Sequence, residues 1–366
     1  MKDIFLKIWF TGKLPYEHIK ITKGSNFKQC LLRWFIHPTK RRIARYYLCL
    51  LRKATDLKVI GITGSAGKTT TKEMLAAILK LEDKTVYTVA NIDPVYNIPT
   101  TILRCGLKTR YLILEMGVEY PGEMDFYLWL AKPDIAVITN IFPTHTEFFG
   151  DIEGVFSEKS KLVKSLNKNG IAVLNEADSR LKLLINKIRA KIIWFNGENS
   201  DAARKVSGIF GISEDKIERG LKNYDRPKHR YEIIKHKSGA VVFDDSYNSN
   251  PEALLRTIDK FNQLAKNNTK IAILGDMKEL GKLEESEHRR VGKEIAKSNF
   301  NTVIGVGEAI QFLLDEVLND SQETKILKFQ KAEDALSELK PMLKKNVYVL
   351  IKGSRSIGLD KIADSL

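Results

Sequence analysis

From Lys58 onward, short runs of β-branched and apolar residues alternate with longer stretches of helical character. This alternation is typical of a parallel sheet whose strands are connected by helices. A first series of strands is expected at 59–63, 85–89, 111–115, 135–139 and 171–174, with helices at 68–81, 122–131 and 155–167. The pattern therefore predicts an α/β domain in this part of the chain.

A second α/β series begins near Tyr231. Strands are expected at 241–244, 271–274, 302–306 and 347–351, and a helix at 251–264, which Pro251 opens at its first turn. The junction 223–230 is polar and contains a proline. Because a single core rarely exceeds about 300 residues, we expect a basic amphipathic segment (1–57), a central domain (58–224) and a C-terminal Rossmann-like domain (225–366).

Charge is distributed unevenly along the 366 residues, whose formal net charge is +15. Residues 1–55 contain thirteen Lys or Arg and two acidic residues, so the remainder carries only about +4. The apolar runs of this segment are too short and too interrupted by charge to span a bilayer or to form a cleaved signal. Two interpretations stay open: a basic helix packed on the neighbouring domain, or peripheral contact with an anionic membrane surface.

The same segment carries no nucleic-acid recognition motif, and we expect no nucleic-acid partner. The three cysteines (Cys30, Cys49, Cys105) are scattered, which indicates a reducing compartment without a disulfide framework or a zinc site. We therefore expect a cytoplasmic protein, with membrane contact limited to the periphery of the inner face.

A glycine-rich turn lies between the first expected strand and the first expected helix. Backbone N–H groups of such a turn point at phosphate oxygens, and the helix N-terminus adds a favourable dipole. The strict pattern places glycine at position 62, where this chain has Ile62, and the variant here uses Gly64. Lys68 would neutralise the terminal phosphates and the Thr69 hydroxyl can bind Mg²⁺. ATP binding is predicted for Thr63, Gly64, Ser65, Ala66, Gly67, Lys68, Thr69 and Thr70.

A phosphate loop alone does not distinguish a ligase from a kinase, a GTPase or a motor, so other motifs must decide. Together with Glu115-Met116-Gly117 and the stretch 139–150, the loop resembles the Mur ligase family. Within the C-terminal half, 244–251, 275–281 with His288, and 352–355 look like the branch of that family that adds D-alanyl-D-alanine. The resemblance covers about residues 58–366 and involves several motifs in the expected order.

The resemblance implies ATP-dependent joining of a carboxylate to an amine through an acyl phosphate. A carboxylate that attacks a triphosphate is an anion meeting an anion, so the site must supply positive charge and metal. By resemblance, Thr69 and Glu115 would hold one Mg²⁺, and His145 and Lys159 a second. Catalytic roles fall to Lys68, His145 and Lys159, the last as a lysine carbamylated by CO₂. Lys161, two residues away, leaves that assignment open.

The C-terminal half supplies further expected contacts by the same resemblance. Arg230 would reach the ATP phosphates and Asp245 the ribose. The substrate residues would be Asn91, Asn248, Asn250 and Arg355, although Asn-Ser-Asn-Pro also reads as a turn and helix cap. The asparagine that contacts adenine would be Asn196 or Asn199.

The chain departs from the family pattern at its beginning. Only about 57 residues precede the first strand, where the family has a sizeable domain for the uridine nucleotide. One hypothesis is that the basic segment replaces that domain. We expect a monomer that uses a UDP-MurNAc-peptide-like carboxylate and a dipeptide amine. The alternatives are another amide ligase, such as a polyglutamate type, a partner-dependent nucleotide-binding subunit, or a small-molecule kinase.

Overall fold

The computed structural model describes residues 35–89, 92–321 and 323–366. It divides into two compact units. The first runs to Phe142 and resumes from Asp151 to Pro227, and the second combines Pro143–Gly150 with Lys228–Leu366. The sequence places a boundary at 224/225, whereas the units change over between Pro227 and Lys228. The short segment Pro143–Gly150 has no separate status in the sequence prediction.

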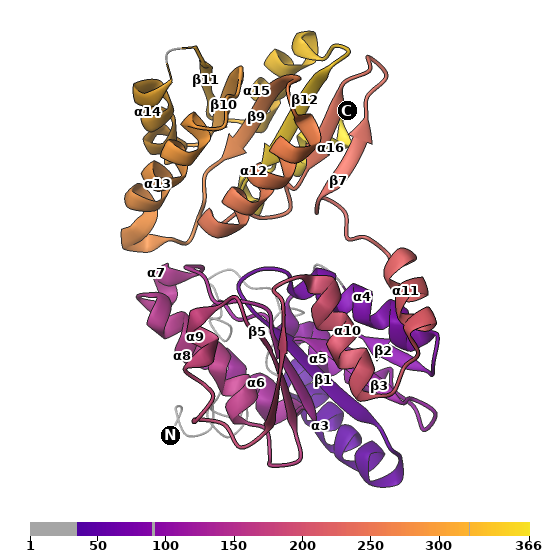
Figure 1. The fold of residues 1–366 in the computed structure, drawn as a ribbon. Coiled ribbons are helices and arrows are strands. Elements are labelled where there is room, and N and C mark those ends of the chain that lie inside the picture. Colours follow the sequence, from indigo (N-terminus) through magenta and orange to yellow (C-terminus); the bar gives the residue numbers. More distant parts are fainter. Residues whose placement is uncertain (1–34, 90–91, 322) are drawn as a thin grey trace. The chain divides into compact units, whose positions relative to one another are not determined.

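Parallel strands form the sheet of the first unit, in the spatial order β2-β3-β1-β4-β5-β6 (Figure 1). Their bounds are Lys58–Thr63 (β1), Thr85–Tyr87 (β2), Tyr111–Glu115 (β3), Ile135–Ile138 (β4), Ile171–Asn175 (β5) and Lys191–Phe195 (β6). The five strands expected in this region are confirmed, and β6 is an addition. Glu115 lies opposite Ile62 and Ile138 lies opposite Thr63, so the carboxyl ends of β1, β3 and β4 share one edge.

Helices cover both faces of this sheet because its strands are apolar on both sides. On one face α4 contacts α10 and α11, above an apolar core that includes Ile60, Ile62 and Ile78. On the other face α3 contacts α5 and α6, and α6 contacts α8. The helices of this unit are α3 (His37–Ala54), α4 (Lys68–Lys80), α5 (Pro94–Leu103), α6 (Glu123–Leu130), α8 (Ile152–Lys164), α9 (Ser179–Lys182), α10 (Asn199–Ile209) and α11 (Glu214–Lys222).

The basic helix α3 packs on the first unit through its own basic side chains. Arg41 is buried, with its guanidinium 5.2 Å from the ring centroid of Phe126 and 5.8 Å from that of Tyr96. Burial lowers the pKa of Arg41 to about 10. Arg45 lies 4.8 Å from the ring centroid of Trp129. These contacts confirm the packed-helix interpretation for the described part of the basic segment.

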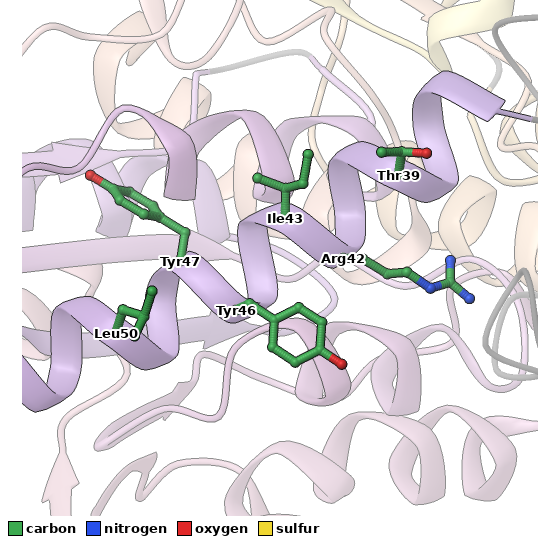
Figure 2. Close-up of a pocket in the computed structure, with 6 residues that line it drawn as sticks. All are labelled: Thr39, Arg42, Ile43, Tyr46, Tyr47 and Leu50. Atoms are coloured by element: carbon green, nitrogen blue, oxygen red, sulfur yellow. The ribbon is translucent and has the colours of Figure 1, made fainter.

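Another face of α3 remains exposed and largely apolar. Ile43, Tyr46 and Leu50 are each more than half exposed. A hollow of about 400 Å³ lies along this helix. Figure 2 shows the side chains that line it: Thr39, Arg42, Ile43, Tyr46, Tyr47 and Leu50. None of the predicted site residues lines it. Within the described ranges, no helix has both the length and the apolar character needed to cross a bilayer.

The second unit contains a sheet in the order β11-β10-β9-β12-β8-β7, in which only β7 is antiparallel to its neighbour among the described strands (Figure 1). The four strands predicted here are confirmed as β8, β9, β10 and β12. The bounds are Glu232–Lys235 (β7), Val241–Asp244 (β8), Thr269–Gly275 (β9), Thr302–Val306 (β10), Lys325–Phe329 (β11) and Val347–Lys352 (β12).

Two apolar cores hold the helices of the second unit against its sheet. One joins β9 to α12, α13 and α14 through residues such as Leu254, Phe261 and Leu313. The other joins the sheet to α15 and α16 through Leu339 and Ile362. The helices are α7 (Thr146–Phe149), α12 (Pro251–Ala265), η3 (Gly281–Leu283), α13 (Glu284–Ala296), α14 (Ile310–Asp320), α15 (Ala332–Leu339), η4 (Lys340–Met342), η5 (Arg355–Ile357) and α16 (Asp360–Asp364). The mixed α/β fold with two mostly parallel sheets is therefore confirmed.

Candidate functional site

The predicted phosphate loop joins β1 to α4 at the carboxyl edge of the first sheet. Gly64 and Gly67 both have positive φ angles, 146° and 81°. A Cβ atom added to Gly64 would lie 1.9 Å from the Thr139 hydroxyl oxygen, so only glycine fits there. Ile62 is fully buried within β1 and pairs with Glu115. The unusual glycine spacing therefore follows from a strand that continues through position 62.

Two residues that follow β4 brace this loop. The Thr139 hydroxyl donates to the Ala66 carbonyl, and the Asn140 amide both donates to that carbonyl (3.1 Å) and accepts from the Ala66 N–H (2.8 Å). The Ser65 N–H donates to the Asn140 carbonyl at 3.0 Å. The sequence prediction used both residues as part of a motif but not as site residues. The signal that could have found them is a polar pair directly after a buried strand, next to the strand that carries the loop.

The residues at the start of α4 face the end of β3. The Lys68 ammonium donates to the Gly64 carbonyl at 2.8 Å, which places its charge over the loop. The Thr69 hydroxyl donates to the Glu115 carboxylate at 2.8 Å. The Thr63 hydroxyl donates to the Met116 carbonyl at 2.7 Å, and Thr70 is half-buried in the first turn. The structure thus brings Lys68, Thr69 and Glu115 together, and their binding of a nucleotide and its metal stays a prediction.

Thr69 and Glu115 form a donor set that fits Mg²⁺. Mg²⁺ prefers oxygen ligands and usually takes one or two from the protein and the rest from phosphates and water. A hydroxyl and a carboxylate oxygen 2.8 Å apart at a helix N-terminus meet that preference. The helix dipole also favours the phosphates that would share the ion.

Lys159 and Lys161 lie on α8 but have different surroundings. Lys159 is 1% exposed, and its pKa falls to about 7 because burial disfavours the ammonium and the charge of Lys68 adds to this effect. Lys161 is partly exposed and pairs with Asp125 (2.7 Å) and Glu158 (2.6 Å). These ion pairs raise the pKa of Lys161 despite an opposing effect of burial. Of the two, only Lys159 presents an amine that loses its proton near neutral pH.

Asn199, and not Asn196, lies beside the phosphate loop. Its amide oxygen accepts from the Thr71 hydroxyl at 3.3 Å, and a Cβ added to Gly67 would lie 2.4 Å from that oxygen. The Asn196 amide oxygen instead accepts from the Glu198 N–H at 3.0 Å, within its own turn. Asn91, the predicted substrate residue of the first unit, lies outside the described residues.

The motifs of the second unit also follow strand ends. Asp244 ends β8 and Asp245 follows it, Asp276 follows β9, and Lys352 ends β12, all at the carboxyl edge of the second sheet. Lys352 is buried and its ammonium contacts one carboxylate oxygen of Asp245. The Thr257 hydroxyl donates to the same oxygen at 2.7 Å. One carboxylate oxygen of Asp245 is therefore already bonded to side chains of the second unit.

Arg230 and Arg355 lie over the same aromatic ring. Their guanidinium carbons are 4.1 Å and 4.9 Å from the ring centroid of Tyr247. His229 and Tyr231, on either side of Arg230, both have left-handed backbone conformations, with φ of 60° and 52°. Tyr247 was not predicted as a site residue, because no local pattern indicates that two distant arginines converge on it. The structure thus concentrates cationic charge at one point of the second unit.

The Asn-Ser-Asn-Pro stretch has the structure of a turn and helix cap. The Asn250 side chain accepts from the Ala253 N–H at 2.9 Å and caps α12. The Asn248 side chain accepts from the Ser249 N–H at 2.9 Å, while its carbonyl accepts from Lys352 at 3.0 Å. Both asparagines have structural roles here, and their contact with a substrate stays a prediction.

His145 belongs to the second unit, whereas Lys159 belongs to the first. It has a left-handed backbone (φ 56°), and its Nδ1 contacts the Glu279 carboxylate. This contact lowers the pKa of Glu279. The Thr146 hydroxyl next to it donates to the Leu280 carbonyl at 2.9 Å. The predicted sharing of a metal by His145 and Lys159 stays a prediction.

One cluster of His, Asp and Glu side chains in the described part of the chain has donor atoms close enough to hold a metal: His229, Glu232 and Asp244, within 4.8 Å of one another. His229 Nδ1 is already 2.7 Å from an Asp244 oxygen, which is a hydrogen-bond distance. The backbone N–H of His229 also donates to the Glu232 carboxylate at 3.2 Å. The cluster therefore joins the segment before β7 to the end of β8 through hydrogen bonds.

Comparison with known proteins agrees with this arrangement. Residues 62–240 match the family model of the Mur ligase middle domain, and residues 229–355 that of the Mur ligase, glutamate ligase domain. The UDP-N-acetylmuramoyl-tripeptide–D-alanyl-D-alanine ligase of Bacillus subtilis is 29% identical, across 89% of this chain and 78% of its own. The protein of the same name from Borreliella burgdorferi is 31% identical, across 85% of this chain and 75% of its own.

A solved structure shows the same fold. The MurF ligase from Thermotoga maritima, in complex with ADP, superimposes with a TM-score of 0.78 and 25% sequence identity. The match covers 90% of this chain and 82% of the other. The resemblance that the motifs indicated is therefore confirmed. This chain belongs to the Mur ligase family of ATP-dependent ligases and is similar to its MurF members.

Proposed function

We propose that this protein uses ATP to join D-alanyl-D-alanine, or a similar dipeptide, to the peptide carboxylate of a UDP-linked muramoyl precursor of peptidoglycan. The observation that carries the proposal is the braced phosphate loop with its Thr69–Glu115 pair. It occurs in a chain that aligns along most of its length with enzymes named for that reaction. In this assignment, residues 58–224 bind the nucleotide and activate the carboxylate, and residues 225–366 contribute to both substrates.

The first step is attack of the substrate carboxylate on the γ-phosphoryl group, which forms an acyl phosphate and releases ADP. The loop N–H groups and Lys68 bind the transferred phosphate and stabilise its charge. Thr69 and Glu115 would hold Mg²⁺, which supplies further positive charge where two anions meet. The dipeptide amine then attacks the acyl carbon, loses a proton, and inorganic phosphate leaves.

Lys159 is proposed to carry a carbamate. CO₂ adds only to a neutral amine, and the pKa of Lys159 is about 7. The addition releases a proton and turns a cation into an anionic oxygen donor, of the kind that Mg²⁺ prefers. Lys159 in this form, with His145, would hold a second Mg²⁺ near the acyl phosphate.

The second unit is proposed to complete both substrate sites. Arg230 would contact the ATP phosphates and Asp245 the ribose, through the carboxylate oxygen that Lys352 and Thr257 leave free. Asn91 of the first unit, together with Asn248, Asn250 and Arg355, would contact the peptide substrates. Closure of the two units during turnover would exclude water from the acyl phosphate.

The test is a matrix of carboxylate and amine substrates assayed for ADP and phosphate release. UDP-MurNAc-tripeptide with D-Ala-D-Ala should give the highest kcat/KM, and hydroxylamine should trap the acyl phosphate. Lys68→Ala should abolish release. Turnover only with glutamate as the amine would favour a polyglutamate-type ligase. ATP binding without turnover of any pair would favour a partner-dependent nucleotide-binding subunit.

Three finer expectations stay proposals: contact of residues 1–55 with an anionic membrane, a role of that segment in holding a diphosphate, and a monomeric state. Because α3 packs on the first unit, a deletion to residue 54 would remove part of that packing. Removal of residues 1–34 leaves α3 intact and is the better test. Binding to anionic and neutral vesicles, the KM for the UDP-linked substrate, and the mass in solution would each decide one expectation.

A further inference from the structure

Lys72 is an almost completely buried lysine on α4, one helical turn after Lys68. Its side chain is 0% exposed, although lysine is among the residues least often buried without a partner. Its ammonium lies 2.9 Å from the Glu73 carboxylate and 3.5 Å from the Glu115 carboxylate. The role proposed for Lys68 does not account for this second cation. Because burial of an ammonium is costly, its position calls for a physical reason.

The two oxygens of Glu115 are held by two different residues of α4. One accepts from the Thr69 hydroxyl at 2.8 Å, and the other faces Lys72. The backbone N–H of Glu115 is also held, since it donates to the Thr88 hydroxyl at 3.0 Å. Without Lys72, the Glu115 carboxylate would stand near the buried carboxylate of Glu73 with no cation between them. Like charges at that range repel, and even with Glu73 neutralised the Glu115 oxygen that faces Lys72 would lose the contact that sets its direction.

We infer that Lys72 is a positioning residue that fixes the Glu115 carboxylate for the metal–nucleotide complex. The inference rests on the proposed function, in which Thr69 and Glu115 hold Mg²⁺. Lys72 would act through geometry, because it lies on the same rigid helix as Thr69 and therefore sets both Glu115 oxygens relative to the loop. Residues that orient a metal ligand from outside typically contribute 10- to 100-fold to metal affinity. Glu73 forms an ion pair with the ammonium of Lys72 at 2.9 Å, although the geometry is not that of a hydrogen bond.

A simpler role would be charge balance alone. Lys72, Glu73 and Glu115 together carry a net charge of −1, and the double variant K72M/E73Q keeps that net charge without the ammonium. Removal of both partners of a buried pair is often nearly neutral for stability, whereas removal of one leaves an uncompensated charge. The double variant therefore separates the position of Glu115 from the charge around it, and is expected to fold even where K72M does not.

The experiment measures binding of a fluorescent ADP analogue to the full chain, with Mg²⁺ and with EDTA. Lys80→Met is the matched control, because Lys80 lies on the same helix and near the same Tyr87 ring but is exposed. The wild type and K80M should show the same Mg²⁺-dependent gain in affinity. K72M and K72M/E73Q should lose about tenfold or more of that gain, with binding in EDTA unchanged.

If K72M/E73Q showed the same Mg²⁺-dependent gain in affinity as the wild type, the inference would be overturned, because charge balance would then suffice. The same gain in affinity in K72M would overturn the inference as well. An equal loss of binding with and without Mg²⁺ would show damage to the loop itself and also overturn it. A wild type that binds the analogue without any Mg²⁺-dependent gain would instead refute the proposed metal assignment, which the variants alone cannot do.

Discussion

Lys159 makes the stability of the first unit depend on pH in a window that few side chains reach. Its pKa is about 7 in the folded protein, against an ordinary value of 10.5 that applies to the unfolded chain. Between these values the unfolded chain binds more protons than the folded one, so the free energy of unfolding rises with pH. Below pH 7 both states are protonated and the dependence ends. The window is therefore from about pH 7 to 10.5.

The size of this change in the free energy of unfolding follows from the shift in the pKa of Lys159. Each pKa unit corresponds to about 1.4 kcal/mol, so the full window is worth about 5 kcal/mol and its slope is about 1.4 kcal/mol per pH unit. Lys159 is buried, so solvent does not screen this effect. Replacement by methionine, which has a similar length and no charge, removes the titrating group. K159M should therefore be more stable than the wild type by about 4 kcal/mol at pH 7, and the difference should vanish as the pH approaches 10.5.

Tryptophan fluorescence can report this unit without the second one, because the described tryptophans, Trp129 and Trp194, lie in it and no tryptophan follows residue 194. Urea unfolding would be followed between pH 7 and 9.5 in CO₂-depleted buffer, which keeps Lys159 as an amine. K161M is the matched control, since Lys161 is a partly exposed lysine on the same helix whose own pKa is raised rather than lowered, so its replacement should leave the slope in place. Parallel stability curves for the wild type and K159M would refute the reasoning, and with it the reactive amine that carbamylation needs.

Three further predictions concern the loop and the second unit. Gly64→Ala should abolish ADP binding in fluorescence titrations, because its Cβ meets a hydroxyl at 1.9 Å, whereas Gly106→Ala, with open space around it, should bind normally. Burial lowers the pKa of His288, so the second unit should lose stability as the pH falls below about 6.5, and H288Q should lack that loss in hydrogen exchange of β9. Arg230→Lys should raise the KM for ATP about tenfold, because lysine lacks the planar group that stacks on Tyr247; an unchanged KM would contradict a phosphate role.

The central strands and the phosphate loop could be predicted because their signals are local. A strand buried on both faces is a short apolar run, and a loop that binds phosphate needs glycine at fixed points. The elements that escaped prediction are of a different kind. β7 is largely exposed on an edge, and β6 is only partly buried. The four residues of β7 include only two apolar ones, whereas β6 contains the apolar run 192–195, which the sequence analysis did not assign to a strand.

The choice between Lys159 and Lys161 shows what a closer reading of periodicity could have resolved. Residues two positions apart on a helix are separated by about 200° around the helix axis, so Lys159 and Lys161 face opposite ways. The apolar positions Val155, Leu162 and Val163 fall at helical spacing with 159, and the structure buries all of them with Lys159. The convergence of Arg230 and Arg355 on Tyr247 had no such signal. It depends on how β8 and β12 pair, which no local pattern states.

Three lysines of the described ranges are almost completely buried, and their partners separate their roles. Lys72 faces Glu73 and Glu115, and Lys352 faces Asp245. Lys159 forms no ion pair with a described carboxylate; burial and the charge of Lys68 lower its pKa, and the more distant Glu119, Glu123 and Glu158 only partly oppose this. A buried lysine that contacts a carboxylate can hold that carboxylate in place. A buried amine without one gives up its proton and becomes a nucleophile. Lys72 and Lys352 thus contact acidic side chains at the two carboxyl edges, whereas the lowered pKa of Lys159 is the property on which its proposed carbamylation depends.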